Sequence, residues 1–332
     1  MNVRRIFWVF LAVLCTLGIS FATAPAQADA AADPVKSRFI TYNVCGGVCP
    51  IYQNDPAAWR DTLVKAIDNW NADVVMLQEV CYDQWTTLRS ALQDRTTGAQ
   101  YDSIWTATLS DVGNCKKWKK DSAGTAIGDT RFGLVTLVKG DSNQTINNSE
   151  RTVFPLVNRA GSEDRVLLCG QATVSGKPLR ICNTHIGYET PNVTDQARQV
   201  ALMVNGYVAD GEAVVLGGDF NPPKPNTAWP EPVRHSYNLS YLYRHNQGTG
   251  VFQEVDETDT AYFTTSCAGQ PVCRTGENTA DTCSTQNPDF VPIKLDYIFV
   301  SPAFKDPSGD AATCTTGMSD HRLLRGEATW AS

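Results

Sequence analysis

Apolar residues recur along the chain with two different spacings. Trp59, Leu63, Ile67 and Trp70 lie three or four positions apart, which predicts a helix with one apolar face. The aliphatic run 214–216 is too short for a helix core and is followed by glycines, so it predicts a buried strand. The chain therefore combines amphipathic helices with short strands.

The same two patterns predict the other elements. Helices are expected at 56–70, from 85 to near 98, and from 191 to near 211. Strands are expected at 38–44, 72–80, 101–109, 132–138, 164–174, 178–186, 214–216, 295–300 and 323–330. Hairpins predominate, and neither an internal repeat nor an interdomain linker is visible. This order of elements predicts packed sheets flanked by helices.

One long segment, 222–291, lacks a regular pattern. It is rich in proline, asparagine and threonine and contains three cysteines. Unpatterned segments of this length inside a domain are usually functional or disordered. The cysteines favour a disulfide-stapled insertion, in which His235 and His245 are interpreted as surface residues.

The N-terminus has the pattern of a secretory signal. Two arginines precede the apolar run 6–21, and small residues at 26–28 offer a cleavage site. A membrane anchor would need about 20 apolar residues, more than this run contains. We therefore expect a secreted protein with a signal peptide at 1–28, a short extension at 29–37 and a single domain at 38–332.

Ten of the eleven cysteines lie outside the signal, and an even number in an exported chain indicates disulfides. A two-residue turn at 175–176 would place Cys169 opposite Cys182, so we predict a bridge across that hairpin. The spacing of Cys45 and Cys49 could also suit a metal or redox site. In an exported protein, a local disulfide between them is favoured.

Charge limits the kinds of partner. The net charge of -7 does not attract polyanions from a distance, so tight, salt-driven nucleic-acid binding is not expected. Turnover of a phosphodiester at a local site is compatible with this charge. A polar loop with Lys117, Trp118 and Lys119 is most simply a solvated loop, but its tryptophan makes it the best candidate for contacting a polyanion.

Polar residues follow the apolar strands abruptly. Asp219 and Asn221 end the strand at 214–216 and would present a carboxylate and a carboxamide on one side. They could hold a water beside a phosphoryl oxygen, or simply form an Asx turn before a proline. The full set of such groups is Asn43, Glu79, His185, Asp219 with Asn221, Asp296, and Asp320 with His321. Each alone has an ordinary structural explanation, but together they indicate one site.

The motifs that carry these residues are TYNV at 41–44, LQEV at 77–80, NTH at 183–185, GDFN at 218–221, LDYIFVS at 295–301 and SDH at 319–321. In this order they resemble the motifs of the endonuclease/exonuclease/phosphatase superfamily, the fold of pancreatic deoxyribonuclease. The resemblance runs from about 38 to 330. It implies an α/β fold of the α+β type, a four-layer sandwich of two packed, mainly antiparallel sheets between helical layers. It also implies a divalent metal, usually magnesium, and hydrolysis of a phosphoester.

The candidate metal ligands are mostly oxygen donors. Glu79 is the expected anchor, with Asn43 and Asp320 near it, and oxygen ligands suit Mg²⁺ or Mn²⁺. Zinc is less expected, because the cysteines are assigned to bridges and the chain has four histidines. The metal would polarise a phosphoryl oxygen during in-line attack by water.

The remaining site residues receive catalytic roles. Asp219 and Asn221 would position the attacking water, and His321, oriented by Asp296, would take up its proton or bind a phosphate oxygen. His185 would stabilise the pentavalent state or assist the leaving group. Whether His321 or Asp219 is the formal base stays open. Tyr188 joins the residues of the lysine loop as a substrate-binding candidate.

The preferred function is a secreted, metal-dependent nuclease acting on DNA or RNA. Alternatives are a phospholipase C or sphingomyelinase type of hydrolase, a small-molecule phosphatase, and a binding module that has kept the fold without catalysis. The segment 222–291 is polar apart from its tyrosines, so stable membrane insertion is not expected. No protein partner is implied, and we expect a monomer.

Overall fold

The structure is a computed structural model that describes residues 34–49, 54–140, 146, 150–159, 161–189, 192–222, 236–245, 247–257, 259, 274, 276–280, 283, 293–315 and 317–331. The expected signal peptide, most of the extension at 29–37, residues 190–191 and much of the segment 222–291, including His235, lie outside these ranges. No helix among the described residues is long and apolar enough to cross a membrane.

The first sheet contains the strands nearest the two ends of the described chain. Its order is β11-β12-β1-β2-β4-β3, and only β1 and β2 run parallel. The strands are β1 (Lys36–Asn43), β2 (Val74–Cys81), β3 (Tyr101–Leu109), β4 (Phe132–Lys139), β11 (Phe304–Ala311) and β12 (Leu324–Trp330).

The second sheet comes from the middle of the chain. Its order is β5-β6-β7-β8-β10-β9, and only β7 and β8 run parallel. The strands are β5 (Thr152–Pro155), β6 (Val166–Val174), β7 (Lys177–His185), β8 (Val214–Asp219), β9 (Gln253–Glu254) and β10 (Asp296–Val300).

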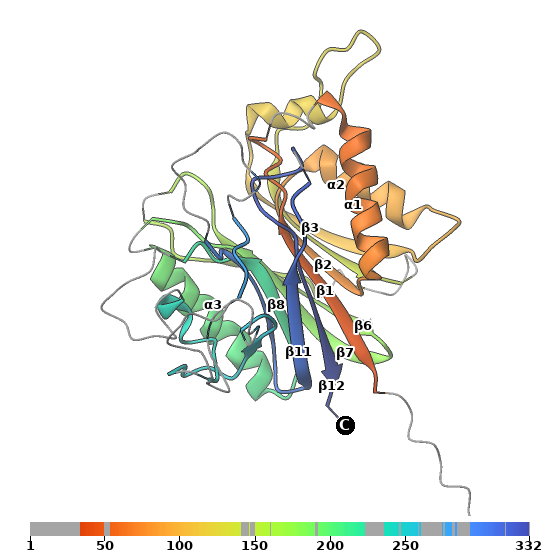
Figure 1. The fold of residues 1–332 in the computed structure, drawn as a ribbon. Coiled ribbons are helices and arrows are strands. Elements are labelled where there is room, and N and C mark those ends of the chain that lie inside the picture. Colours follow the sequence, from red (N-terminus) through yellow and green to blue (C-terminus); the bar gives the residue numbers. More distant parts are fainter. Residues whose placement is uncertain are drawn as a thin grey trace, which may run out of the picture. The chain divides into compact units, whose positions relative to one another are not determined.

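Helices cover the outer faces of the two sheets. The helices α1 (Pro56–Trp70) and α2 (Tyr82–Gln93) pack on the first sheet, and α3 (Asn192–Ala209) packs on the second (Figure 1). Between the sheets lies an apolar layer that includes Met76, Ile181 and Ile298. The predicted four-layer arrangement with mainly antiparallel sheets is therefore confirmed.

Helix α1 shows why the apolar spacing predicted the elements well. Asp55 caps the helix by accepting a hydrogen bond from the Ala58 backbone nitrogen (2.9 Å), and proline follows at the first helical position. Asn71 ends the helix in the left-handed conformation. The buried residues are Trp59, Leu63 and Ile67, three of the four residues of the predicted apolar face.

Three strands were not predicted. β11 has the polar sequence FKDPSGDA and contains a proline, which is tolerated because β11 lies at the edge of its sheet. β5 and β9 are four and two residues long. In all three, pairing with a neighbouring strand outweighs a weak local pattern.

The predicted disulfides Cys169–Cys182 and Cys45–Cys49 are both present. Cys169 and Cys182 are paired across the β6–β7 hairpin, whose two turn residues both have positive φ, as a tight hairpin turn of this kind requires. Two further bridges join Cys81 to Cys115 and Cys283 to Cys314. Disulfides are compatible with the expected secretion.

Candidate active site

Strand register brings three of the site residues into one row. In the second sheet, Asp219 at the end of β8 is paired with His185 at the end of β7 and with Asp296 at the start of β10. The parallel strands β1 and β2 end nearby in the first sheet and supply Asn43 and Glu79. The site therefore lies where the ends of the two sheets meet.

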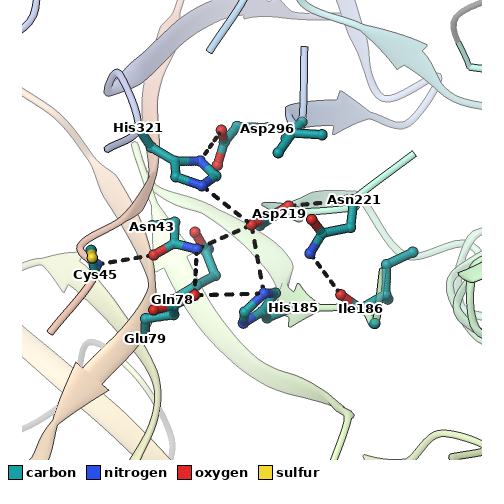
Figure 2. A network of polar contacts seen from close by, with 12 residues as sticks. Asn43, Cys45, Gln78, Glu79, His185, Ile186, Asp219, Asn221, Asp296 and His321 are labelled. Carbon is teal, nitrogen blue, oxygen red and sulfur yellow. Dashed lines mark hydrogen bonds and ion pairs between the residues drawn. The ribbon is translucent and has the colours of Figure 1, made fainter. Parts of the chain in front are cut away.

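Asn43 joins the carboxylates of the two sheets. Its Nδ2 donates to Glu79 Oε1 and to Asp219 Oδ2, each at 3.0 Å, while its Oδ1 accepts the Cys45 backbone N–H at 3.0 Å (Figure 2). One lone pair of the amide oxygen is therefore engaged by the backbone. In this arrangement the Asn43 amide holds the two acids in place, and its expected role as a metal ligand stays a prediction.

The backbone at Glu79 is strained. Its φ is +58°, and the pairing of β2 with β4 shifts between Leu77 and Val80. A left-handed, non-glycine residue at a bulge costs free energy and is common at functional sites. The bulge turns the Glu79 side chain toward Asn43, which a sequence pattern for a regular strand cannot indicate.

A buried amide pair supports this strand end. Gln78 Nε2 donates to Asn183 Oδ1 at 2.8 Å, and Asn183 Nδ2 donates to the carbonyls of Leu77 (3.0 Å) and Val135 (2.8 Å). Gln78 and Asn183 are completely buried and connect β2 to β7 between the sheets. They lie directly before Glu79 and two residues before His185, so they fix the two sheets relative to each other at the site.

His321 forms a buried pair with Asp296. Its Nδ1 lies 2.8 Å from Asp296 Oδ2, and its Nε2 lies 3.7 Å from Asp219 Oδ2. Burial alone would lower the pKa of His321, but the carboxylates of Asp296, Asp219 and Asp320 raise it well above its usual value. His321 is therefore a cation at neutral pH, held by Asp296 and facing Asp219.

His185 has the opposite protonation state. Its Nε2 lies 3.6 Å from Asp219 Oδ2 and 4.0 Å from Glu79 Oε1. Burial, followed by the positive charges of Arg165 and His321, lowers the pKa of His185 well below its usual value. Figure 2 shows Asp219 between this neutral imidazole and the charged one of His321.

Asp219 uses both of its oxygens. Oδ1 accepts the Asn221 backbone N–H at 3.0 Å, which is the Asx turn considered from the sequence, while Oδ2 faces Asn43 and both histidines. The two interpretations of the sequence are thus compatible, because one oxygen of Asp219 forms the turn and the other faces the site. Asn221 has a φ of +38° and donates its side-chain amide to the Ile186 carbonyl at 2.9 Å.

The stability of the metal-free protein is expected to depend on pH through Asp219. Burial raises the pKa of Asp219 to about 7 from its usual 3.8. Between these values the unfolded chain releases a proton that the folded protein keeps, so stability falls as the pH rises. The Tm of the Asp219→Asn variant relative to wild type, measured in EDTA, should therefore increase from pH 4 to pH 7. A difference that stays constant over this range would contradict the burial of an ionisable carboxyl.

Two charged residues at the site, Glu163 and Arg165, were not predicted from the sequence. Glu163 Oε1 lies 3.8 Å from His185 Nδ1 and accepts the Thr108 hydroxyl at 3.0 Å, and Glu163 Oε2 lies 3.1 Å from Arg165 Nη2. Arg165 is 8% exposed, and its buried Nη1 has no hydrogen-bond partner among the described residues. The sequence does contain a sign of their role, because these charged residues directly precede the apolar strand β6, as other site residues directly follow apolar strands.

The acidic groups fit a divalent cation. Burial raises the pKa of Glu79, the Asn43 amide opposes this rise, and the negative charge of Asp320 raises the pKa again. Two carboxylates that repel each other at a partly exposed position are stabilised by a cation, and oxygen donors suit Mg²⁺ or Mn²⁺. Asp320 is held beside Asn43 by Ser319, whose hydroxyl donates to the Asn43 carbonyl at 2.6 Å.

Among the residues that the structure describes, two other groups of side chains have the spacing of metal ligands. Asp219, Asp296 and His321 are buried together, but the Nδ1 of His321 is occupied by Asp296. Cys45 and Cys49 lie near Asp320, but their sulfurs are joined in a disulfide and are not free to bind a metal. Glu79 with Asp320 therefore stays the predicted pair of ligands.

The candidate substrate-binding residues differ in how far they are exposed to solvent. Tyr188, three residues beyond His185, is 69% exposed, and Lys117 and Lys119 are exposed. Trp118 is buried, donates its Nε1 to the Gly46 carbonyl at 2.9 Å and packs edge-on against Trp59. The expectation that Trp118 contacts a polyanion is wrong, because its ring is enclosed by the protein.

Trp118→Ala is expected to lower the free energy of unfolding by about 3 kcal/mol, the usual cost of removing a large buried aromatic side chain. Lys117→Ala, next to it on the surface, should change stability by less than about 0.5 kcal/mol. Urea unfolding followed by circular dichroism measures both values. Equal stability of the two variants would show that Trp118 is not part of the core.

The family comparison agrees with the geometry. The model of the "Endonuclease/Exonuclease/phosphatase family" matches residues 40–321, which include all eight predicted catalytic and metal-binding residues. No curated protein sequence matches this chain.

Solved structures with the same fold share little sequence with this chain. An endonuclease/exonuclease/phosphatase from Bacteroides vulgatus has 17% identity and a TM-score of 0.58 over 90% of this chain and 100% of its own. A truncated TDP2 from Caenorhabditis elegans has 15% identity and a TM-score of 0.55 over 89% and 97%. A mannosyl-6-phosphatase from Bacteroides thetaiotaomicron has 16% identity and a TM-score of 0.56 over 89% and 100%. At this identity the likeness concerns the fold.

Proposed function

The chain belongs to the endonuclease/exonuclease/phosphatase family of phosphoester hydrolases, and we propose that it is a secreted, Mg²⁺- or Mn²⁺-dependent phosphodiesterase that cleaves DNA or RNA. The observation that carries the proposal is the convergence of Glu79 and Asp219 on Asn43 at one junction of the two sheets, with His321 facing Asp219. A bound divalent cation would supply charge neutralisation at a phosphoryl oxygen.

The water-activating role falls to Asp219. Asp296, 2.8 Å from His321 Nδ1, favours the protonated form of His321, so Asp219 is the better first acceptor of the proton that the attacking water releases. Asp219 Oδ2 lies 3.7 Å from His321 Nε2. Burial raises the pKa of Asp219 to about 7, which makes this carboxylate an effective base near neutral pH. Asn221, fixed by Ile186, would help to hold the water.

The two cationic groups would bind the phosphate. His321 presents its Nε2–H, with Asp296 fixing the ring, and Arg165 has a buried guanidinium nitrogen without a partner among the described residues. Such preorganised donors stabilise the negative charge that develops in the transition state. Neutral His185, beside Asp219, is placed to donate a hydrogen bond to the pentavalent state or the leaving oxygen.

A phosphomonoesterase is the second candidate. The net charge of -7 is less favourable for a polyanion than for a small phosphate ester, and one protein of the same fold is a mannosyl-6-phosphatase. A lipid phosphodiester stays a third substrate class. A binding module without catalysis is disfavoured by the completeness of the polar set.

One substrate panel tests the proposal. Plasmid DNA, single-stranded RNA, mannose 6-phosphate, and vesicles of sphingomyelin or phosphatidylcholine are each incubated with Mg²⁺ and with EDTA. We expect EDTA-sensitive cleavage of a nucleic acid by wild type, and none by Asp219→Asn. Exclusive hydrolysis of the monoester or of a lipid would replace the nuclease proposal, and no metal-dependent hydrolysis of any substrate would refute phosphoesterase function.

A further inference from the structure

A small loop closed by a disulfide lies directly beside the candidate metal site. We call residues 45–49, closed by the Cys45–Cys49 bond, the disulfide loop. It begins two residues after Asn43, and Cys45 has a positive φ of 51°, so the chain turns sharply at the end of β1. The loop carries no group that could act in catalysis, yet it contacts the residues around the cation site.

The loop first determines the orientation of Asn43. The Cys45 backbone N–H donates to Asn43 Oδ1 at 3.0 Å, and this leaves Nδ2 to face the carboxylates of Glu79 and Asp219. An Asn side chain without that donor could turn its amide by 180° and present an oxygen to the two acids. The position of the Cys45 N–H therefore controls which end of the amide the acids meet.

The loop also supports the strained backbone of Glu79. The Gly46 N–H donates to the Glu79 carbonyl at 2.9 Å, at the bulge where φ is +58°. A Cβ on Gly46 would lie 1.9 Å from Gln84 Oε1 and 2.5 Å from the Glu79 carbonyl, so only glycine permits this approach. On its other side the Gly46 carbonyl accepts the Trp118 indole N–H.

The disulfide itself lies close to Asp320, which like Glu79 is a predicted metal ligand. Both sulfur atoms are within 4.8 Å of an Asp320 carboxylate oxygen. Cys45 is buried, and Cys49 is partly exposed. The disulfide loop thus lies against the Asn43 side chain, the Glu79 backbone carbonyl and the Asp320 carboxylate.

We propose that the Cys45–Cys49 disulfide is a positioning element of the metal site, and that opening it weakens divalent-cation binding. This inference rests on the proposed metal-dependent function. Outer groups that orient metal ligands typically contribute 10- to 100-fold to metal affinity. Opening requires a dithiol reductant, which is oxidised to its own disulfide while Cys45 and Cys49 each become a thiol.

A purely stabilising role is the alternative. In that case the effect would follow the amount of chain that the bridge closes, and the bridge Cys169–Cys182, with a sequence separation of 13, should matter more than Cys45–Cys49, with a separation of 4. Cys169 and Cys182 are fully buried on the face of the second sheet that packs on α3. They provide a matched control.

The test compares metal affinity and thermal stability in two double variants. Calorimetric titration of Mn²⁺ should give a Kd at least about tenfold higher for Cys45→Ala/Cys49→Ala than for wild type. Cys169→Ala/Cys182→Ala should lower the Tm more but leave the Kd unchanged. The metal concentration for half-maximal activity should shift in parallel for the first variant, with kcat largely restored at saturating metal.

Wild-type protein provides a second measurement that does not depend on the folding of a variant. Mild dithiol treatment, with alkylation of Cys49 monitored by mass spectrometry and unchanged circular dichroism, should raise the Mn²⁺ Kd to the same extent. An unchanged Kd after complete opening of Cys45–Cys49 overturns the inference and leaves the proposed function intact. Absence of Mn²⁺ and Mg²⁺ binding by untreated wild type overturns both.

Discussion

Glu79→Gln is expected to reduce kcat/KM for phosphoester hydrolysis by about 1,000-fold or more. The variant keeps the shape of the side chain and an oxygen for Asn43 Nδ2, but it removes the negative charge that anchors the cation. Metal polarisation of a phosphoryl oxygen is worth several kcal/mol, and each 1.36 kcal/mol corresponds to about tenfold in rate. Steady-state kinetics over a range of Mg²⁺ concentrations, together with Mn²⁺ calorimetry, measure the loss.

Glu327→Gln is the matched control for this experiment. The Glu327 side chain is 19% exposed, close to the 22% of Glu79, and it pairs with Lys36 and Arg38 at the start of β1. The Glu327→Gln variant should retain the kinetics and the metal affinity of the wild type. Glu79→Gln protein that binds Mn²⁺ as tightly as wild type would show that the anchor of the cation lies elsewhere.

His321→Ala is expected to lower kcat by about 10²- to 10⁴-fold, the usual contribution of a positioned proton donor or acceptor. The change removes the cation that faces Asp219 and leaves Asp296 as an unpaired buried carboxylate. Asp296→Asn should give a smaller loss, because the imidazole remains but is no longer held as a cation. Rates at saturating metal and substrate separate these effects from weaker binding.

His245 provides the comparison for the loss of a histidine paired with a carboxylate. Its Nδ1 lies 3.0 Å from Glu257 Oε1, in a segment that contributes no side chain to the site described above. His245→Ala should therefore leave kcat unchanged even if it lowers the Tm. A His321→Ala enzyme with near-native kcat would eliminate the mechanism, whatever the stability of the protein.

The contrast between the two site histidines depends on their neighbours. His321 and His185 are both nearly fully buried, and burial disfavours the charged form of each. Asp296 at 2.8 Å reverses this effect for His321, whereas His185 lies close to the positive charge of Arg165. The protein thereby keeps one cationic and one neutral imidazole on either side of Asp219, which suits phosphate binding and hydrogen bonding, respectively.

The sequence by itself determined most of the elements and most of the site residues, but not β5, β9, β11, Glu163 or Arg165. Apolar spacing is a local property, so it identified α1, the hairpin with Cys169 and Cys182, and the strand before Asp219. Polar residues at the ends of buried strands pointed to one pocket, because strand ends meet at the edge of a sheet. The ordered motifs then indicated the family.

Only the tertiary structure decided how these residues are used. The direction of the Asn43 amide depends on the Cys45 N–H, the exposure of Trp118 depends on Trp59 and Gly46, and the contact of Glu163 with His185 joins residues from different strand ends. Each of these outcomes depends on contacts between segments distant in sequence or on the backbone angles of a loop. A local pattern of apolar and polar residues does not determine the free energy of such contacts.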